Sequence, residues 1–267
     1  MKKSINIFMA VCLIFSIGSP LAARAEVSNK PVHWGFTKGR DGKPADAGKQ
    51  LENLLKDYGG VYKGDPGKKD IYLTFDNGYE NGYTEQILDV LKKEKVPAAF
   101  FITGHYLETA EDLVIRMAEE GHTIGNHSYY HPDLTEVSDE RLKTELEKVR
   151  EKTYEMTGQK HMAYLRPPRG ILSERTLKLA KEEGYTHILW SLAFMDWDTK
   201  RQKGWEYSYN NIMKQIHPGA VLLLHTVSKD NAEALEKVIR DLKKQGYTFK
   251  TLDDLMLEGT LQNPMLY

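Results

Sequence analysis

Apolar positions along the chain change their pattern near residue 70. Beyond that point, short apolar runs alternate with segments in which apolar residues recur at helical spacing. Seven such runs occur, at residues 71–75, 98–103, 123–125, 163–165, 188–192, 220–224 and 248–250. Strict alternation of strands and helices predicts parallel strands wrapped by helices. We therefore expect an α/β fold, a distorted (β/α) barrel with about seven parallel strands and an N-terminal extension; an open doubly wound sheet is the alternative.

Helical spacing is clearest in residues 138–156. A stripe of apolar positions recurs there at steps of four and three from Leu142, on an otherwise charged segment. This spacing predicts an amphipathic helix with one buried face. A second helical pattern covers residues 47–58, and residues 230–233 (Asp-Asn-Ala-Glu) predict a capping box at the start of another helix.

The N-terminus has the three parts of a secretory signal peptide. The chain begins Met1-Lys2-Lys3, continues with an apolar run over residues 5–17 and reaches Ala23-Arg24-Ala25. The run is shorter than the roughly 20 residues that span a bilayer. We therefore expect cleavage after residue 25, export to the cell envelope, and no membrane span in the mature chain; an uncleaved anchor is the alternative.

Removal of that segment changes the composition. Cys12, the only cysteine, would be lost, which excludes disulfides and thiol catalysis from the mature chain. Three of the 37 basic residues would also be lost and none of the 38 acidic ones, leaving a net charge of −4 and no basic footprint for nucleic acid. Residues 26–69 are expected to form the extension, residues 70–257 one main domain and residues 258–267 a C-terminal tail, in a monomer.

Five polar motifs directly follow predicted strands. They are Asp76-Asn77-Gly78, His127 with His131, Arg166-Pro167-Pro168-Arg169-Gly170, Asp196-Trp197, and His225. Each alone has a structural interpretation: a turn, two surface histidines, a rigid proline loop, or a buried histidine with its hydrogen bonds satisfied. Because the carboxyl ends of barrel strands meet at one rim, where barrel enzymes assemble their active sites, the five together predict one site. Histidines four apart can share a metal if their segment makes a helical turn. His105 lies near the same rim and is a weaker candidate.

The motif order TFDNG, HSYYH, RPPRG, DW and LLLH resembles the five-motif signature of the polysaccharide deacetylases, the NodB-homology domain of carbohydrate esterase family 4. The resemblance covers about residues 69–257. Residues 34–36 (WGF), 75–84 (FDNGYENGYT) and 225–228 (HTVS) are similar to the delta-lactam-forming muramic acid deacetylases of bacterial spore cortex.

The resemblance implies roles for the motif residues. His127 and His131 would bind a divalent metal, with zinc expected, and Asp76 would be the base, oriented by Arg166. His225 would be the acid, held in its cationic form by Asp196. A backbone N–H near Arg169 or Gly170 would complete an oxyanion site, and Trp197, like Tyr129 and Tyr130, could stack on a sugar ring. Most family members have an aspartate as third metal ligand where this chain has Asn77, so we expect weaker metal binding here.

The implied function is metal-dependent N-deacetylation of peptidoglycan amino sugars. In its narrower form, the enzyme removes acetate from N-acetylmuramic acid whose peptide is already gone, a step toward muramic delta-lactam in spore cortex, with the glycan strand as partner. The alternatives are N-acetylglucosamine of peptidoglycan, chitin oligomers or acetylated xylan as substrate, or an inactive wall-binding module. Intact Asp76, His127, His131 and His225 argue against the module.

Overall fold

The structure is a computed structural model that describes residues 27–262. The predicted signal peptide, residues 1–25, lies outside the described residues, as does Cys12. No helix in the described part of the chain is long and apolar enough to cross a membrane.

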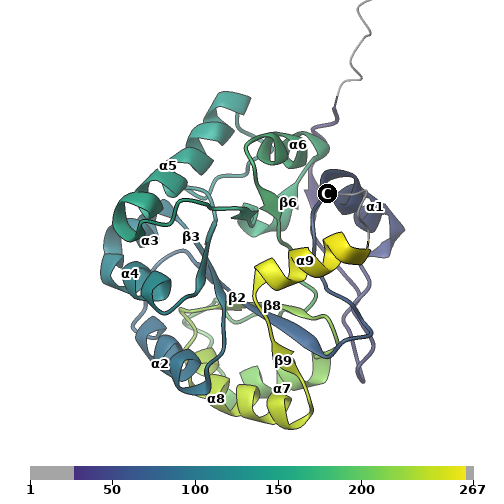
Figure 1. Ribbon diagram of the computed structural model, residues 1–267, viewed down its shortest axis with the longest axis vertical. Coiled ribbons are helices and arrows are strands. Elements are labelled where there is room, and N and C mark those ends of the chain that lie inside the picture. The colour runs from purple at the N-terminus through teal and green to yellow at the C-terminus, as the bar shows by residue number, and fades with distance from the viewer. Residues whose placement is uncertain (1–26, 263–267) are drawn as a thin grey trace, which may run out of the picture.

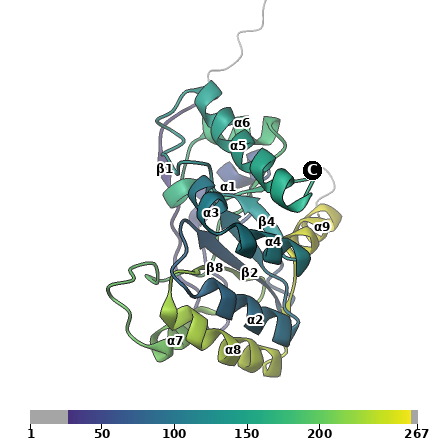
Figure 2. The same cartoon turned by 90° about the vertical axis from the view of Figure 1, so that its left-hand side faces the viewer.

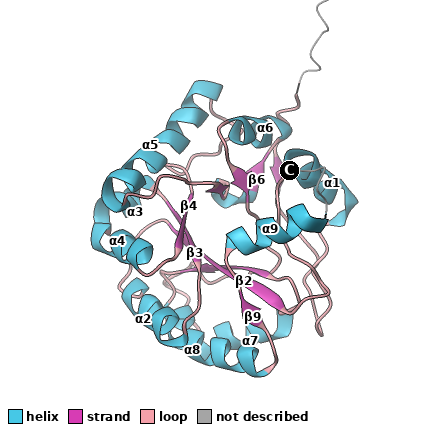
Figure 3. Ribbon diagram, in the orientation of Figure 1, coloured by secondary structure: helices cyan, strands magenta, loops and turns pink. Residues whose placement is uncertain are grey.

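A curved sheet of seven parallel strands forms the centre of the molecule, ringed by helices (Figures 1 and 3). The strands are β2 (Asp70–Asn77), β3 (Ala99–Ile102), β4 (Thr123–Asn126), β5 (Tyr164–Leu165), β7 (Thr186–His187), β8 (Val221–His225) and β9 (Thr248–Phe249). Their order is β7-β5-β4-β3-β2-β8, and β9 pairs with the start of β2. The predicted distorted (β/α) barrel is confirmed.

The segment after β7 closes the ring in an irregular way. Leu192 forms an isolated parallel bridge with Leu222 of β8, and the Leu223 N–H donates to the Leu192 carbonyl oxygen over 2.9 Å. The predicted strand at 188–192 is therefore wrong in its position, since regular pairing with β5 is confined to residues 186 and 187. Only single bridges continue beyond them, because this short segment passes from pairing with β5 to pairing with β8.

Helices cover the outside of the sheet in both views (Figures 1 and 2). They are α2 (Thr84–Glu94), α3 (Gly104–Thr109), α4 (Glu111–Glu119), α5 (Asp139–Thr157), α6 (Glu174–Glu182), α7 (Trp205–Gln215), α8 (Lys229–Lys244) and α9 (Leu252–Gln262). Leu252 and Leu255 of α9 pack against Tyr72 and Val221 at the amino ends of their strands, so α9 closes that end of the barrel. Because α9 continues to Gln262, the predicted tail begins inside a helix.

The helix predicted over 138–156 is confirmed as α5. The Ser138 side chain caps it by accepting from the Arg141 N–H. The predicted stripe is buried from Leu142 to Thr153, and Met156 at its end is partly buried. The capping box predicted at Asp230 is wrong. Ser228 caps α8 instead, because the Asp230 carboxylate accepts from the Lys203 N–H over 2.6 Å.

Residues 27–69 pack along one side of the barrel. Strand β1 (Val32–His33) pairs antiparallel with β6 (Ile171–Leu172), and α1 (Gly48–Tyr58) coincides with the helix predicted at 47–58. The Trp34 N–H donates to the Gly170 carbonyl oxygen over 2.8 Å, and its indole Nε1 donates to the Trp190 carbonyl oxygen over 3.0 Å. The N-terminal segment therefore supports two loops at the carboxyl ends of the strands.

Candidate active site

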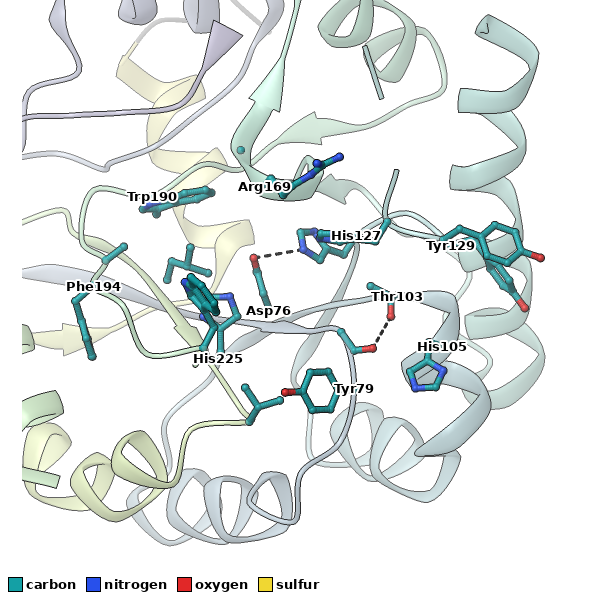
Figure 4. Close-up of a pocket in the computed structure, with 18 of the residues that line it drawn as sticks. Asp76, Tyr79, Thr103, His105, His127, Tyr129, Arg169, Trp190, Phe194 and His225 are labelled. Carbon is teal, nitrogen blue, oxygen red and sulfur yellow. Dashed lines mark hydrogen bonds and ion pairs between the residues drawn. The ribbon is translucent and has the colours of Figure 1, made fainter. Parts of the chain in front are cut away.

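A cavity of about 1090 Å³ opens at the carboxyl ends of the strands. Its wall includes seven of the ten predicted site residues: Asp76, His127, His131, Arg169, Gly170, Trp197 and His225. In Figure 4, Trp190 and Arg169 lie along one side, Tyr79 and His225 along the other, and Asp76 and His127 between them. The green loop that leads into α7 in Figure 2, which carries Trp197, extends away from the body of the molecule. Arg166, Asp196 and Asn77 are buried and do not line the cavity.

Asp76 at the end of β2 is held from behind by Arg166, which follows β5. Arg166 Nη1 donates to Asp76 Oδ1 over 2.7 Å, and its Nε donates to the Ile188 carbonyl oxygen over 3.0 Å. Burial opposes ionisation of Asp76, but the cationic Arg166 and the neighbouring histidines keep the pKa of this carboxyl below its ordinary value. Asp76 is therefore ionised at neutral pH, with Oδ2 3.5 Å from His127 Nε2.

The two histidines of the second motif face each other, with ring centroids 4.8 Å apart. The conditional interpretation that a helical turn joins them is wrong. The segment has no helix, and Ser128 and His131 instead adopt left-handed backbone angles, with φ of 62° and 55°. Such angles are uncommon for residues other than glycine and often occur at functional sites.

Both imidazoles are suited to ligate a metal. His127 Nδ1 donates to the Arg166 carbonyl oxygen over 2.8 Å, which leaves the lone pair of Nε2 free. Burial lowers the pKa of His127, and burial together with His127 lowers the pKa of His131 to about 4. Both rings are therefore neutral at neutral pH, the state that binds metal.

His225 at the end of β8 is oriented by Asp196. His225 Nδ1 donates to Asp196 Oδ1 over 2.7 Å, while the His225 backbone N–H and Asn231 Nδ2 donate to Oδ2 over 2.8 and 2.6 Å. Burial favours the neutral ring, but the Asp196 carboxylate outweighs it and raises the pKa of His225 above its ordinary value. His225 is thus a polarised proton donor on the cavity wall, half-buried, with Nε2 not bound to Asp196.

Comparison with known proteins identifies the family to which this arrangement belongs. The family model for polysaccharide deacetylases matches residues 63–188. The chain is 54% identical to the peptidoglycan-N-acetylmuramic acid deacetylase PdaA of Bacillus subtilis, over 92% of this chain and 94% of that protein. The chain belongs to the polysaccharide deacetylase family.

Two further relatives agree. A peptidoglycan-N-acetylglucosamine deacetylase of Bacillus cereus is 33% identical over 75% of this chain and 73% of that protein. The solved structure of Bacillus subtilis PdaA, described as a family 4 carbohydrate esterase, aligns with a TM-score of 0.86 over 87% of this chain and 100% of that one. The predicted family is confirmed, and with it the prediction of a hydrolase that acts on amide bonds.

Asn77, the predicted third metal ligand, is buried behind the cavity wall. Its side chain is fully buried, and Nδ2 donates to Thr226 Oγ1 over 2.8 Å. Its Oδ1 accepts no hydrogen bond from the described residues, so that oxygen is not taken by a protein donor. Within residues 27–262 no group of three His, Cys, Asp or Glu side chains could hold a metal. The donors on the cavity wall that fit a divalent metal are thus the two neutral imidazoles, and Asn77 as third ligand stays a prediction.

The two amides named for the oxyanion site differ. The Gly170 N–H donates to the Pro167 carbonyl oxygen over 3.0 Å, so it is already engaged, which favours the Arg169 N–H of the two alternatives. Arg169 stands beside it with φ of 57°, in the short 3-10 turn Pro168–Gly170. The paired prolines rigidify this turn, as their fixed φ angles predict.

Several wall residues carry no motif signal. Thr103, Glu108, Trp190 and Phe194 line the cavity beside the motif residues. So do the weaker candidate His105 and Tyr79, which belongs to the motif run 75–84. The position of a residue just after a strand could have identified Thr103, which follows β3 directly. Of the aromatic candidates, Tyr130 and Trp197 are more than half exposed at the cavity, whereas Tyr129 is buried and its hydroxyl donates to Glu108.

Proposed function

We propose that the protein is a metal-assisted N-deacetylase of the cell wall, which releases acetate from N-acetylmuramic acid residues of peptidoglycan whose peptide has been removed. The observation that carries the proposal is the meeting, in one sugar-sized cavity, of an ionised Asp76, two neutral imidazoles and the polarised His225. The identity to a muramic acid deacetylase over most of both chains supports the choice of sugar.

The chemistry must overcome a poor electrophile and a poor leaving group. A divalent metal held by His127 and His131, with zinc expected, would lower the pKa of a water towards ~7 and polarise the acetyl carbonyl. Asp76 removes a proton as the water oxygen bonds to the carbonyl carbon. Asp76 is effective as a base although its pKa is low, because it is ionised throughout the neutral range.

Proton donation by His225 completes the reaction. As the bond from the carbonyl carbon to the sugar nitrogen breaks, His225 gives its proton to the nitrogen, and acetate and a free amine result. Asp196 stabilises the cationic ring before the transfer. The Arg169 backbone N–H is the amide that would bind the developing oxyanion, since the Gly170 N–H is engaged.

Exposed aromatic rings at the cavity suit a glycan strand. Tyr130 and Trp197 present large apolar faces to solvent, and such faces stack on sugar rings. A protein that acts on such a strand works outside the cytoplasm, which agrees with the signal peptide predicted over residues 1–25. We place its action in the cell envelope, as a step toward muramic delta-lactam in spore cortex, where the freed amine can attack the lactyl carboxyl group.

Mass spectrometry of the products from defined glycans tests the proposal. Peptide-stripped glycan should lose one acetyl group for each muramic acid, and acetylated glucosamine in the same strand should remain intact. Loss of acetyl from glucosamine alone would instead support the second candidate function, to which the relative from Bacillus cereus points. Sugar binding without acetate release, with metal supplied, would indicate an inactive wall-binding module.

A further inference from the structure

Among the described residues, Arg169 is a cation without a partner on the cavity wall. Its side chain is exposed in the cavity, and none of its nitrogens takes part in a hydrogen bond or ion pair with another side chain of residues 27–262. Arg166, three residues earlier, is fully buried and committed to Asp76. Two arginines of one motif therefore have opposite environments.

The other charges at the cavity are already balanced. The Asp76 carboxylate accepts from Arg166, and His225 faces the Asp196 carboxylate. Glu108 lies 3.2 Å from Lys152 Nζ and also accepts from the Tyr129 hydroxyl. The unbalanced charge that a ligand would meet at this wall is therefore the Arg169 guanidinium.

The backbone around Arg169 is fixed from two sides. Gly170 accepts from the Trp34 N–H and, with φ of 67°, leaves room for the Trp190 ring, which a Cβ would approach to 2.8 Å. Arg169 itself has a left-handed φ of 57° in a turn that begins at Pro168. In Figure 4 its side chain runs alongside His127, and its charge acts on His131. The turn thus presents the guanidinium beside the imidazoles at which the acetamide must bind.

A muramic acid residue carries two groups on adjacent ring carbons: the acetamide on C2 and a lactyl ether on C3. While the peptide is attached, the lactyl carboxyl is a neutral amide, and peptide removal converts it to a carboxylate. When the acetamide lies between Asp76 and His225, the lactyl group is close to the reacting centre. The planar guanidinium of arginine binds a carboxylate through two parallel hydrogen bonds, and an amide lacks both the charge and the second acceptor oxygen.

We infer that Arg169 binds the lactyl carboxylate of muramic acid and thereby selects strands from which the peptide has been removed. The inference rests on the proposed function and gives it a specificity-determining residue.

The test compares two substrates in two proteins. A short peptide-stripped muramic acid glycan is offered as the free acid and as its lactyl methyl ester, and kcat/KM is measured for wild type and Arg169→Gln. Wild type should prefer the acid on the order of tenfold to a hundredfold, the range for a hydrogen bond to a charged group. In Arg169→Gln the ratio of kcat/KM for the acid to that for the ester should fall close to one. Arg169→Lys, which keeps the charge, should retain part of the preference for the acid.

A matched control and a separate outcome keep the test decisive. Arg40→Gln removes another exposed arginine, which does not line the cavity, and should keep the wild-type ratio of acid to ester. If Arg169 had only a structural role, its replacement would lower kcat/KM equally for the acid and the ester. An unchanged ratio of acid to ester in Arg169→Gln therefore overturns the inference. If wild type releases acetate from glucosamine but from neither muramic substrate, the proposed function itself fails.

Discussion

Arg166 Nη1 donates to Asp76 Oδ1 over 2.7 Å, and both side chains are buried. The Arg166 guanidinium also lies 4.1 Å from the centre of the Phe101 ring, so little water reaches it. A buried pair of this kind contributes little net stability, but removing one partner leaves an uncompensated charge. The relationship therefore serves the site, where it keeps the base ionised and fixed in position.

Replacement of Arg166 by glutamine should be costly for stability. The buried Asp76 carboxylate would lose its cation, and the free energy of unfolding should fall by about 3–5 kcal/mol, measured by urea denaturation. Arg240→Gln removes a half-exposed guanidinium that pairs with Glu94 and Glu236, and should cost less than about 1 kcal/mol for each pair. Equal losses in the two variants would contradict the importance we assign to burial.

Asp196→Asn should move the alkaline limb of the pH–rate profile to lower pH. The acid must be protonated to act, and the Asp196 carboxylate is what raises the pKa of His225. The raised pKa of His225 also stabilises the folded state. This contribution is fully present below about pH 6.5, the pKa of a histidine in the unfolded chain, and is lost as pH rises through the pKa of His225 in the folded state. Wild type should therefore lose this contribution above neutral pH, and the variant should lack it.

Asp198→Asn is the control for that profile. Asp198 lies two residues away and pairs with the exposed Arg201 over 3.4 Å. Its neutralisation should leave the alkaline limb unchanged. A limb that stays in place in Asp196→Asn would remove His225 from the role of acid.

The barrel could be predicted from the sequence because its signals are local. Apolar runs, a helical stripe and polar residues at strand ends are each visible over a few residues, and the predicted helices at 47–58 and 138–156 lie within one residue of α1 and α5. The strand near 188 was misplaced because residues 188–192 leave β5 to pair with β8, and that choice depends on the closure of the whole ring.

The sequence could predict which residues form the site better than how those residues are arranged. Motif position could not indicate that Ser128 and His131 adopt left-handed angles, since such angles are uncommon for any residue other than glycine. Nor could it indicate that Pro167 occupies the Gly170 N–H, which depends on the turn that forms. Trp190 and Phe194 were missed because aromatic residues line cores and cavities alike.

Asn77→Asp should bind zinc more tightly than wild type. The substitution adds a charged oxygen where Asn77 offers a neutral one, and affinity for a cation rises with the charge of its ligands. A gain of about tenfold or more is expected by calorimetric titration. Without metal the variant should unfold more readily, because a second carboxylate is buried beside Asp76. Asn211→Asp, in a half-buried position on α7 outside the cavity, should leave the zinc affinity unchanged. Equal affinities for Asn77→Asp and wild type would contradict a ligand role for residue 77.

Gly170→Ala should damage the site through the turn that carries Arg169. An alanine at φ of 67° is strained by roughly 1–2 kcal/mol, and its Cβ would also meet the Trp190 ring at 2.8 Å and Trp34 Cβ at 3.1 Å. Overpacking adds about 1–3 kcal/mol, so the free energy of unfolding should fall by more than strain alone explains. Gly121→Ala isolates the strain, because Gly121 has φ of 79° and no atom within 4 Å of its Cβ position. Thermal unfolding should show a larger loss of stability in Gly170→Ala than in Gly121→Ala, and Gly170→Ala should also release less acetate. Equal losses of stability in the two variants would mean that the Trp190 ring moves freely and does not fix the turn.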